Sequence, residues 1–576
     1  MSEKKKESGG KNSQNSSKKE VVRLLPLGGL DEDGKNLMII EIDGDIYIAE
    51  AGLKFPTIKQ ALGIECIIPD FSYLIEHKDR IKAIIITHGH DDVMGALPYL
   101  LAEVKADVYT TEFTARILGR HLNKSGVRGV KIRIVNPLET KRIGGRPVTF
   151  FPLTHSFPQA FGFGVRSKNG WIVYTGEFIE DYNNVHDMYR GEYSALSRFH
   201  NEGVLVLMQD SKGSDRSGHT SPSHRIGPTF RQVLENYAHK RIFVTCYTQS
   251  VFWMEEMLQE CIEMRRPMCF YTRECQELIG DLQAISPQIP DELVISVKDV
   301  KKHDNAVIFI TGQGRNLFKL MINITNNEES DIRFEDGDIV AACTQMIPGV
   351  EKDFGAMEND IYKREGTIIR IDRNAVGMHP AKEDLKMAIY MTTPDYYMPI
   401  KGEYRMLCAN AMIALEMGIP DDRILILDNG QIATFVNGEL VSTEETMELH
   451  DALVDGKENW DQAGVVLKDR EILSTDGVMV LAIGLDSKTK KIVNGPDVQT
   501  RGLIYLREAA YITKDVAKIM EDTIEEMVAN HTYENMEARG AVRDKVVKYL
   551  QKETGKRPMV LTVILEITPD KAADQK

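Results

Sequence analysis

The chain has 576 residues, too many for one compact core, so its length predicts two to four domains. Hydrophobic residues make up 42% and charged residues 27% of the sequence, the balance of a soluble globular protein. No apolar run approaches the ~18 residues that a membrane-spanning helix needs. The net charge of −15 argues against indiscriminate binding to polyanions, although it leaves room for a local basic channel.

Cysteine usage and the first residues predict a cytoplasmic protein. The seven cysteines are odd in number, scattered and without a C-x-x-C pair, which argues against a disulfide framework and a structural zinc knuckle. Residues 1–20 lack the apolar segment of a secretory signal. Their lysines are separated by Ser, Gly and Asn, so we expect a disordered basic tail, for which a solubilising role is favoured over RNA contact.

From Val21 onward, short β-branched runs alternate with helix-length segments. The runs 82–87 and 204–210 are typical of buried strands, and 402–418 is typical of a helix. Alternation at this spacing predicts an α/β fold with buried sheets.

The periodicity fades over 441–470, an acidic stretch that we interpret as a linker. After it the pattern changes to that of a small α+β domain, 471–576, whose place at the end suits assembly or RNA contact better than chemistry. The expected strands are 477–485, 490–494, 502–507 and 558–567, and the expected helices are 513–533 and 536–552.

The segment THGHDD (87–92) carries the strongest chemical signal. It follows a predicted strand, and a helix begins near Met94. Two histidines two apart, His88 and His90, with Asp92 two further on, form a donor set for a metal ion at a strand end. Surface histidines that cap the next helix are the alternative, because an H-x-H-x-acid pattern also occurs by chance.

Later strand ends in the same half carry further candidate ligands. His155 follows TFFPLT, Glu177 follows VYTG, and Asp210 ends VLVLMQD. A single histidine or acidic residue after a strand usually just forms ordinary hydrogen bonds and has no role in a site. Several at successive strand ends of one sheet converge on one edge, which predicts a single site.

The order H-x-H-x-D, then T-H-S at 154–156 and T-G-E at 175–177, resembles the metallo-β-lactamase superfamily. The branch with an inserted β-CASP domain, and within it the ribonuclease J family, fits best, because IPGVEK (347–352) and PIKGEYRM (399–406) also resemble that family. The C-terminal segments ILSTDGVMVLAIGLD and TGKRPMVL do so too. The resemblance covers nearly the whole chain, from about 21 to 567.

The resemblance implies a four-layered αββα metallo-β-lactamase core with an inserted β-CASP α/β domain, plus a C-terminal α+β domain used in dimerisation. It also implies 5′-to-3′ exonuclease and endonuclease activity on RNA with two zinc or manganese ions, which activate a water and neutralise charge at phosphorus. The implied boundaries are 21–215 and 379–440 for the two parts of the core, 216–378 for the β-CASP domain and 441–470 for the linker.

The departures from the family pattern fall on the chemistry. Val93 stands where the family's H-x-H-x-D-H has its last histidine, and a valine cannot bind a metal. The family's T-G-D becomes T-G-E at Glu177, and its V-D-A-G segment has Glu50. The late P-x-H-G-E motif reads PIKGE, which places Lys401 where a histidine ligand belongs.

Most of these departures affect the implied ligands of the second metal rather than those of the first. Only Asp92 and Glu177 remain for the second metal, which is too few donors for a divalent ion. We therefore expect at most one tightly bound zinc or manganese, with the ammonium of Lys401 substituting for the second metal's charge and pairing with Asp92. The implied ligands of the first metal all survive, as His88, His90, His155 and Glu177.

Substrate recognition has changed as well. Of the family's H-x-S-G-H only the last histidine survives, as His379, and the family's A-S-N turn becomes Thr248-Gln249-Ser250. The resemblance implies that His379 stabilises a leaving group, although a lone histidine is more often structural. The catalytic candidates are therefore Asp92, Asp210 and His379, and the RNA-binding candidates are Gln249, Ser250 and His379.

Two functions of different class stay open. In the first, the chain is a weakly active or inactive subunit that binds RNA and an active ribonuclease J paralogue in mRNA decay and rRNA maturation. In the second, it is a working exoribonuclease and endoribonuclease with one metal. A hydrolase of small esters is disfavoured, because the β-CASP and terminal segments would then have no purpose. A second chain with an intact H-x-H-x-D-H in the same genome would favour the first.

Overall fold

The computed structural model describes residues 19–56, 64–182, 187–285, 289–347, 349–371, 377–455, 459–461, 465–503 and 510–567. Residues 1–18 of the predicted tail therefore lie outside the described residues, as do 568–576. The chain separates into two compact units, which are treated one at a time below. The first comprises Met1–Phe55 and Cys66–Ala452, and the second comprises Pro56–Glu65 and Leu453–Lys576.

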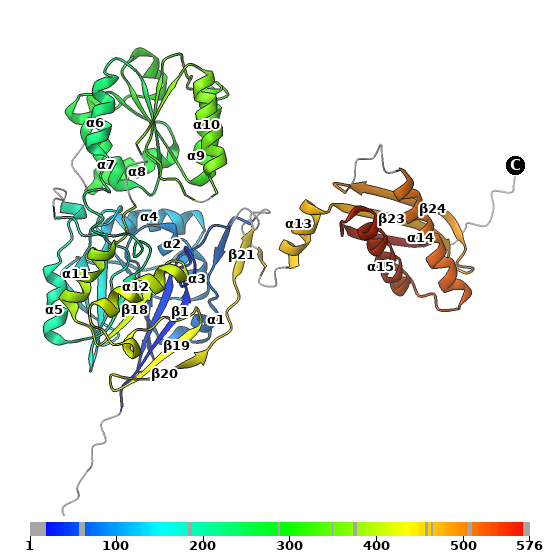
Figure 1. Cartoon of the computed structure of the whole chain (residues 1–576), viewed down its shortest axis with the longest axis horizontal. Coiled ribbons are helices and arrows are strands. Elements are labelled where there is room, and N and C mark those ends of the chain that lie inside the picture. Colours follow the sequence, from blue (N-terminus) through cyan, green and yellow to red (C-terminus); the bar gives the residue numbers. More distant parts are fainter. Residues whose placement is uncertain are drawn as a thin grey trace, which may run out of the picture. The chain divides into compact units, whose positions relative to one another are not determined.

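Two β-sheets pack face to face in the first unit (Figure 1). The larger has the order β20-β19-β1-β2-β3-β5-β6-β7 and the smaller the order β18-β12-β11-β10-β9-β8. Side chains of both sheets, among them Tyr47, Phe150 and Val206, fill one core. The strands are β1 (Val21–Gly28), β2 (Leu37–Ile42), β3 (Asp45–Ala49), β5 (Ile81–Ile85), β6 (Val108–Thr110), β7 (Ile132–Ile134), β8 (Thr140–Ile143), β9 (Arg146–Pro152), β10 (Phe161–Ser167), β11 (Gly170–Tyr174), β12 (Val204–Asp210), β18 (Tyr396–Ile400), β19 (Gln431–Val436) and β20 (Glu439–Thr446).

Helices cover the outer side of this sandwich. Phe199, Leu385 and Ile413 come from three helices and pack against the smaller sheet, whose middle strand β12 is buried along its whole length. A strand covered on both faces is expected to be a continuous apolar run, as VLVLMQD is. These helices are α5 (Ser194–Glu202), α11 (Lys382–Thr392) and α12 (Tyr404–Glu416).

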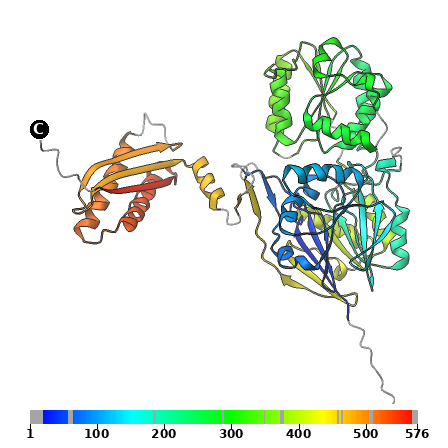
Figure 2. The same cartoon turned by 180° about the vertical axis from the view of Figure 1, so that it is seen from behind.

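The helices after β4 (Cys66–Ile68), β5 and β6 lie beside the larger sheet (Figure 2). The longest of them, α4, buries Phe113, Ile117 and Leu118 along one face, the i, i+4 spacing of an amphipathic helix. The expected four-layered αββα core is thereby confirmed. The helices are α1 (Ser72–Glu76), α2 (Asp91–Met94), α3 (Leu97–Glu103) and α4 (Glu112–Lys124).

An α/β domain is inserted between β12 and α11 (upper part of Figure 1). Its five strands are parallel, in the order β14-β15-β13-β16-β17, with helices on both faces. The expected insertion is confirmed. Its elements are α6 (Gly227–Asn236), β13 (Ile242–Tyr247), α7 (Val251–Glu263), β14 (Met268–Phe270), α8 (Arg273–Ile285), β15 (Val307–Gly312), α9 (Gly314–Thr325), β16 (Ile339–Ala342), α10 (Glu351–Lys363) and β17 (Thr367–Arg370).

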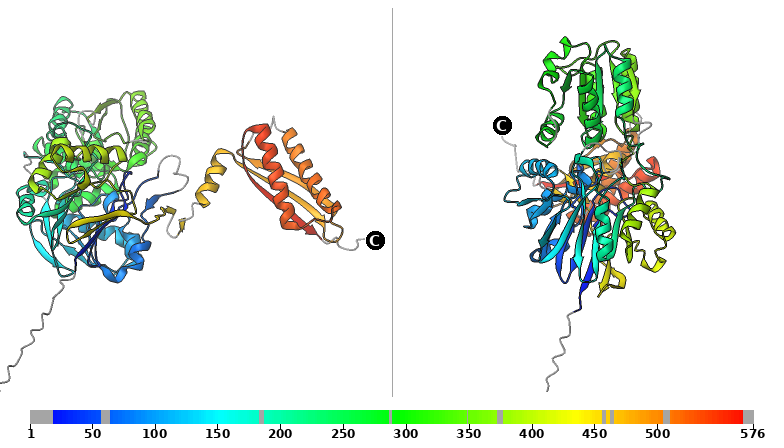
Figure 3. Two further views of the ribbon diagram at one scale, coloured as in Figure 1. Left: turned by 60° about the horizontal axis from the view of Figure 1, so that its bottom comes forward. Right: turned by 90° about the vertical axis from the view of Figure 1, so that its left-hand side faces the viewer.

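The second unit holds a three-stranded sheet, β24-β23-β25, with two long helices on one face (Figure 3, left). Strand β23 pairs antiparallel with β24 and parallel with β25. This is the expected C-terminal α+β domain. Its elements are β23 (Val478–Asp486), β24 (Ile492–Arg501), α14 (Ala510–Ala529), α15 (Asn535–Thr554) and β25 (Met559–Ile567).

Two segments differ from the expected elements. The segment 441–470, interpreted as a linker, contains most of β20, then β21 (Ala452–Asp455), β22 (Asn459–Asp461) and the start of α13 (Val465–Thr475). The strand expected at 490–494 is the first half of the longer β24, because alternating exposure continues through Asp497 to Thr500. Residues 504–507 of the strand expected at 502–507 lie outside the described residues. No helix in the described part of the chain is long and apolar enough to cross a membrane.

Candidate metal centre

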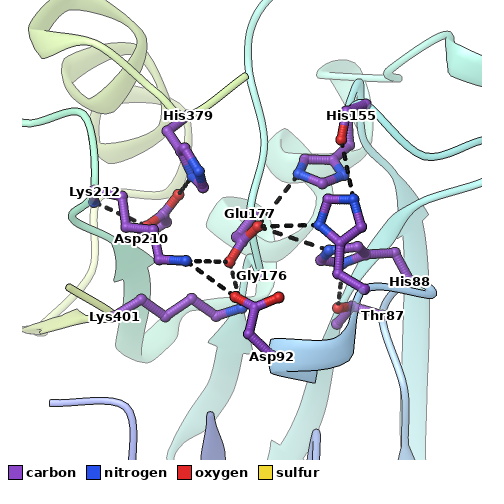
Figure 4. A network of polar contacts seen from close by, with 12 residues as sticks. Thr87, His88, Asp92, His155, Gly176, Glu177, Asp210, Lys212, His379 and Lys401 are labelled. Carbon is purple, nitrogen blue, oxygen red and sulfur yellow. Dashed lines mark hydrogen bonds and ion pairs between the residues drawn. The ribbon is translucent and has the colours of Figure 1, made fainter. Parts of the chain in front are cut away.

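The loops that follow five strands of the sandwich meet at one edge (Figure 4). His88 and His90 follow β5, His155 follows β9, and Glu177 follows β11. Asp210 ends β12, and Lys401 comes directly after β18. Because these strands come from both facing sheets, residues 300 positions apart in the sequence become neighbours, as expected for strand ends in α/β folds.

Three imidazoles surround one carboxylate oxygen at this edge. Oε2 of Glu177 lies 3.3 Å from Nε2 of His155, 3.7 Å from Nε2 of His88 and 4.0 Å from Nδ1 of His90. One ligand atom from each of the four residues lies within 4.8 Å of the others. The sequence prediction for the first metal therefore corresponds to a compact set of three nitrogens and one oxygen.

Neighbouring groups orient two of these histidines. Nε2 of His90 lies 3.1 Å from the backbone oxygen of Gln249, so a proton on Nε2 leaves Nδ1 free to face Glu177. Oγ1 of Thr87 donates to Oε1 of Glu50 (2.7 Å) and lies 3.1 Å from Nδ1 of His88. Hydrogen bonds of this kind fix the tautomer and ring orientation of metal-binding histidines.

The imidazoles are in the neutral form that a metal requires. Burial, followed by the neighbouring histidines, lowers the pKa of His88 well below its usual value, and the same causes lower the pKa of His90 to about 4. Burial also lowers the pKa of His155. Nε2 of His88 is buried and has no hydrogen-bond partner among the described residues. A buried nitrogen without a partner is costly unless an ion binds it, so this donor set fits one transition-metal ion.

The neighbouring position, where the second metal's ligands would lie, contains two lysine ammonium groups (Figure 4). Nζ of Lys212 lies 3.0 Å from Oδ2 of Asp92 and 3.3 Å from Oε1 of Glu177. Nζ of Lys401 lies 3.4 Å from the same Glu177 oxygen and 2.8 Å from Oε2 of Glu50. Val93, the residue after Asp92, is fully buried and offers no ligand atom, so these residues do not fit a second divalent ion.

The charges of these groups stabilise one another. Burial acts to raise the pKa of Glu177, but the ammonium groups of Lys212 and Lys401 outweigh it and hold that pKa well below its usual range. Burial acts to lower the pKa of Lys212, but Asp92, Glu177 and Asp33 raise it well above the usual value. The pKa of Lys401 is raised in the same way, chiefly by Glu177 and Glu50. Both lysines are therefore cationic.

The sequence-based pairing of Lys401 with Asp92 is wrong, because the cation beside Asp92 is Lys212. Lys401, which follows β18, forms its shorter contact with Glu50, which also accepts from the hydroxyl of Tyr174 (2.9 Å). Sequence reasoning missed Lys212, although its position two residues after the strand-end Asp210 was a usable signal, since residues two apart at a strand end face the same way.

Both partners of the buried Lys401–Glu50 pair have strained backbones. Lys401 has φ = +60° and Glu50 has φ = +67°, in the left-handed region that non-glycine residues seldom adopt. Such conformations persist only where the surroundings enforce them, and they cluster at functional sites. The lysine is held toward the site by the fold itself.

The short helix α2, which carries Asp92, is held by the segment around Gly52. Asn36 donates from its side chain to the backbone oxygen (2.9 Å) and to Oδ2 (3.2 Å) of Asp92. Backbone amides of Ala51 and Leu53 donate to the oxygens of Val93 and Asp91. A β-carbon on Gly52 would overlap the carbonyl group of Asp92. Backbone contacts thus fix the main chain at Asp92, and the side chain of Asn36 helps to orient its carboxylate.

The catalytic candidates Asp210 and His379 form a pair at the same edge. Oδ2 of the buried Asp210 lies 3.0 Å from Nδ1 of His379, whose side chain is partly exposed. The His379 and His155 ring centres are 6.5 Å apart. A carboxylate at Nδ1 leaves Nε2 of His379 available to a substrate.

The RNA-binding candidates on the inserted domain differ in their contacts. The side chain of Gln249 donates to Oδ2 of Asp91 (2.8 Å), as does that of Gln313 (2.8 Å). Ser250 instead donates its backbone amide to Tyr247 within its own loop, at the start of α7. Gln249, Gln313 and Asp91 line a cavity of about 410 Å³ between the core and the inserted domain. The structure thus brings Gln249 next to the metal motif.

Comparisons with known proteins bear on all parts of the chain. Three family models match, described as a beta-lactamase superfamily domain (residues 70–195), a ribonuclease J beta-CASP domain (239–361) and a ribonuclease J C-terminal domain (465–567). The chain is 29% identical to a Staphylococcus aureus protein named Ribonuclease J 2 over 559 residues, covering 96% of this chain and 99% of the relative. It is 28% identical to a protein of that name from Staphylococcus epidermidis, with the same coverage.

A solved structure gives an independent view of the fold. It is a protein of unknown function from Enterococcus faecalis V583, with a TM-score of 0.51 and 13% sequence identity, and the match covers 72% of this chain and all of the other.

Proposed function

Because this chain belongs to the ribonuclease J family, a family of metal-dependent RNA-processing nucleases, we propose that it is a weakly active or inactive subunit of that kind. It works beside an active ribonuclease J paralogue in mRNA decay and rRNA maturation. Its site holds at most one tightly bound zinc or manganese ion, through His88, His90, His155 and Glu177.

The observation that supports a degenerate site is the pair of ammonium groups beside Glu177. Lys212 and Lys401 together bring two positive charges to within 3.4 Å of Oε1 of Glu177, the charge of one divalent ion. They satisfy the carboxylates electrostatically. An ammonium group has no empty orbital, however, so it cannot act as a Lewis acid or generate hydroxide from water.

Residues of the chain perform the remaining steps. An ion held by His88, His90, His155 and Glu177 would supply Lewis acidity for activating water. His379, oriented by Asp210, protonates a departing oxygen from Nε2, and Lys212 stabilises charge on a phosphate next to Asp92. Without the second cation, hydrolysis falls far below that of a two-metal relative.

The second candidate, an active one-metal exoribonuclease and endoribonuclease, is supported by the complete first donor set next to the Asp210–His379 pair. A manganese-dependent cleavage assay on 5′-monophosphorylated RNA, with and without the paralogue that carries an intact H-x-H-x-D-H motif, separates the two. Stimulation of the paralogue by this chain, with little cleavage by this chain alone, supports the subunit. Turnover by this chain alone that disappears in His88→Ala supports the one-metal nuclease.

We propose that the chain assembles through its C-terminal α+β domain, residues 471–576, either as a homodimer or with the paralogue. This unit has its own core and leaves apolar side chains of β25, among them Leu561 and Leu565, about half exposed. Light scattering of the full chain, alone and mixed with the paralogue, should show dimers or larger species, and the chain without 471–576 should be monomeric. A full chain that stays monomeric in both samples contradicts the proposal.

RNA binding is proposed to rest on a confined basic strip, because the chain as a whole is acidic. Affinity should then fall steeply with salt through counterion release, and removal of residues 1–19 should weaken it only modestly. A fluorescence titration with single-stranded RNA at several salt concentrations measures both. Binding that does not change with salt contradicts this proposal.

A further inference from the structure

A second group of ligand-type side chains lies where the chain passes between the core and the inserted domain. The outgoing segment (211–226) leads from β12 to α6, and the return segment (377–381) leads into α11. His219 belongs to the outgoing segment, Asp384 to the first turn of α11, and Glu180 to the core loop after β11. One nitrogen or oxygen of each lies within 4.8 Å of the others.

Two buried carboxylates share this small volume. Glu180 is 1% exposed and Asp384 is fully buried. Oδ1 of Asp384 lies 2.8 Å from Nδ1 of His219, while Oδ2 accepts backbone amides of Thr220 (3.0 Å) and Ala381 (2.9 Å). Asp384 therefore presents one oxygen toward His219 with its other oxygen already held in place.

The two carboxylate oxygens of Glu180 differ in their contacts. Its Oε2 accepts the hydroxyl of Tyr182 (2.7 Å), but its buried Oε1 has no hydrogen-bond partner among the described residues. A buried carboxylate oxygen without a partner is costly, and a second carboxylate nearby adds repulsion. A divalent ion would remove both penalties at once.

We propose that Glu180, His219 and Asp384 bind a divalent transition-metal ion, Zn²⁺ or Mn²⁺, at a site separate from the three-histidine centre. An imidazole with two carboxylates is a common donor set for these ions, and water completes the coordination. The side chain of His219 is 46% exposed, which gives the ion a route from solvent.

The ion would tie His219 of the outgoing segment to Asp384 of α11, the helix that the return segment enters, and to Glu180 of the core. Backbone amides at the start of α11 already donate to the outgoing segment, from Lys382 to Arg216 (2.9 Å) and from Glu383 to Gly218 (3.0 Å). Oγ1 of Thr220, next to His219, donates to the backbone oxygen of His379 (2.6 Å). The bound ion therefore stabilises the junction of the two domains and the segment that carries His379.

The test uses the full-length chain with His88→Ala and His155→Ala, so that the three-histidine centre no longer contributes. Equilibrium dialysis against Zn²⁺, and separately Mn²⁺, followed by elemental analysis should give about one ion per chain. Glu180→Gln and His219→Ala should each weaken that binding ~10-fold or more. His239→Ala, a change at an exposed histidine outside the group, should leave it unaltered.

Melting curves with and without the ion give a second readout. The ion should raise the melting temperature of the parent and the His239→Ala variant, and should not raise that of Glu180→Gln. Without metal, Glu180→Gln should melt at the same or a higher temperature, which separates lost binding from misfolding. Absence of binding in the parent, or binding that survives both Glu180→Gln and His219→Ala, would overturn the proposal.

Discussion

The two halves of the candidate centre use the same carboxylate in opposite ways. On the Oε2 side of Glu177, three imidazoles with depressed pKa values leave a position that suits a cation from solution. On the Oε1 side, the cations are the covalently attached ammonium groups of Lys212 and Lys401. A divalent ion can be exchanged or removed, whereas a lysine cannot. The two ammonium groups thus supply positive charge on the Oε1 side but no Lewis acidity.

The difference also shows which feature of a site is easiest to replace. Charge can be supplied by any cation of suitable reach, but Lewis acidity requires a metal with open coordination. The lysines reach Glu177 from two separate loops, one after β12 and one after β18. Charge compensation at the second position is therefore spread over two residues, and restoring a metal requires changing both.

The largest effect is expected when the lysine side of the centre is given histidine ligands like those on the other side of Glu177. Val93→His with Lys401→His and Lys212→Ala should raise the metal content of the centre from one ion toward two. Cleavage of 5′-monophosphorylated RNA should rise ~100-fold or more, since a metal Lewis acid contributes several kcal/mol. Elemental analysis, with Glu180→Gln present in every variant so that the site proposed above does not contribute, and single-turnover assays measure the two quantities. Val93→His alone, with both lysines kept, is the control and should remain at one ion.

The next largest effect is expected from removing a ligand of the three-histidine set. His88→Ala should weaken zinc or manganese binding at the centre ~100-fold or more, because changes to groups that merely hydrogen-bond a metal ligand already cost ~10- to 100-fold. Competition with a chromophoric chelator gives the affinity. The exposed His239→Ala is the matched control. Unchanged affinity in His88→Ala would show that the three-histidine set is not where the ion binds.

Protein stability should distinguish the buried Lys401 from an exposed lysine. Lys401→Met removes a cation that contacts both Glu50 and Glu177, which are buried, and should lower the free energy of unfolding by ~3 kcal/mol. Denaturant titration measures it. Lys363→Met, at a lysine whose side chain is 74% exposed, should change stability by less than ~1 kcal/mol. Equal stabilities of these two variants would contradict the view that Lys401 neutralises buried acids.

The smallest effect is expected at the solvent-facing edge of the second half. Asp33 accepts from Lys212 at 2.9 Å, but its side chain is 78% exposed. Asp33→Asn should therefore change the free energy of unfolding by less than ~1 kcal/mol and leave metal affinity unchanged. A larger loss, by the same denaturant titration, would place Asp33 among the groups that hold Lys212.

Sequence reasoning found the fold and the first half because both follow from local patterns. The apolar runs ending in His88, His155 and Glu177 specify strands and strand ends, and the family resemblance joins them into one site. The arrangement on the lysine side of the centre depends on how far the lysine side chains extend and which acids they contact, and the sequence does not show this. Replacement of a histidine by Lys401 is visible in the motif. A lysine side chain is long enough to contact several acids, however, and the motif does not show that its ammonium group lies 2.8 Å from Glu50.

Contacts across separate domains were also beyond sequence reasoning. Gln249 was expected to bind RNA, yet its side chain contacts Asp91 and its backbone oxygen contacts His90. Such contacts depend on how the inserted domain packs on the core. The spacing of residues within the core or within the inserted domain does not show how the two domains pack. The linker assignment over 441–470 rested on acidic composition, which does not exclude short strands such as β21.

Gly52 has a consequence for how tolerance to mutation should be read in this protein. It has no side chain and touches neither the imidazoles nor the lysines, yet any β-carbon there would displace the backbone of Asp92. In a saturation mutagenesis screen for function, residue 52 should accept glycine alone, as strictly as any ligand. A ranking of positions by intolerance would therefore place a residue without a functional group among the catalytic ones, and only the backbone geometry distinguishes them.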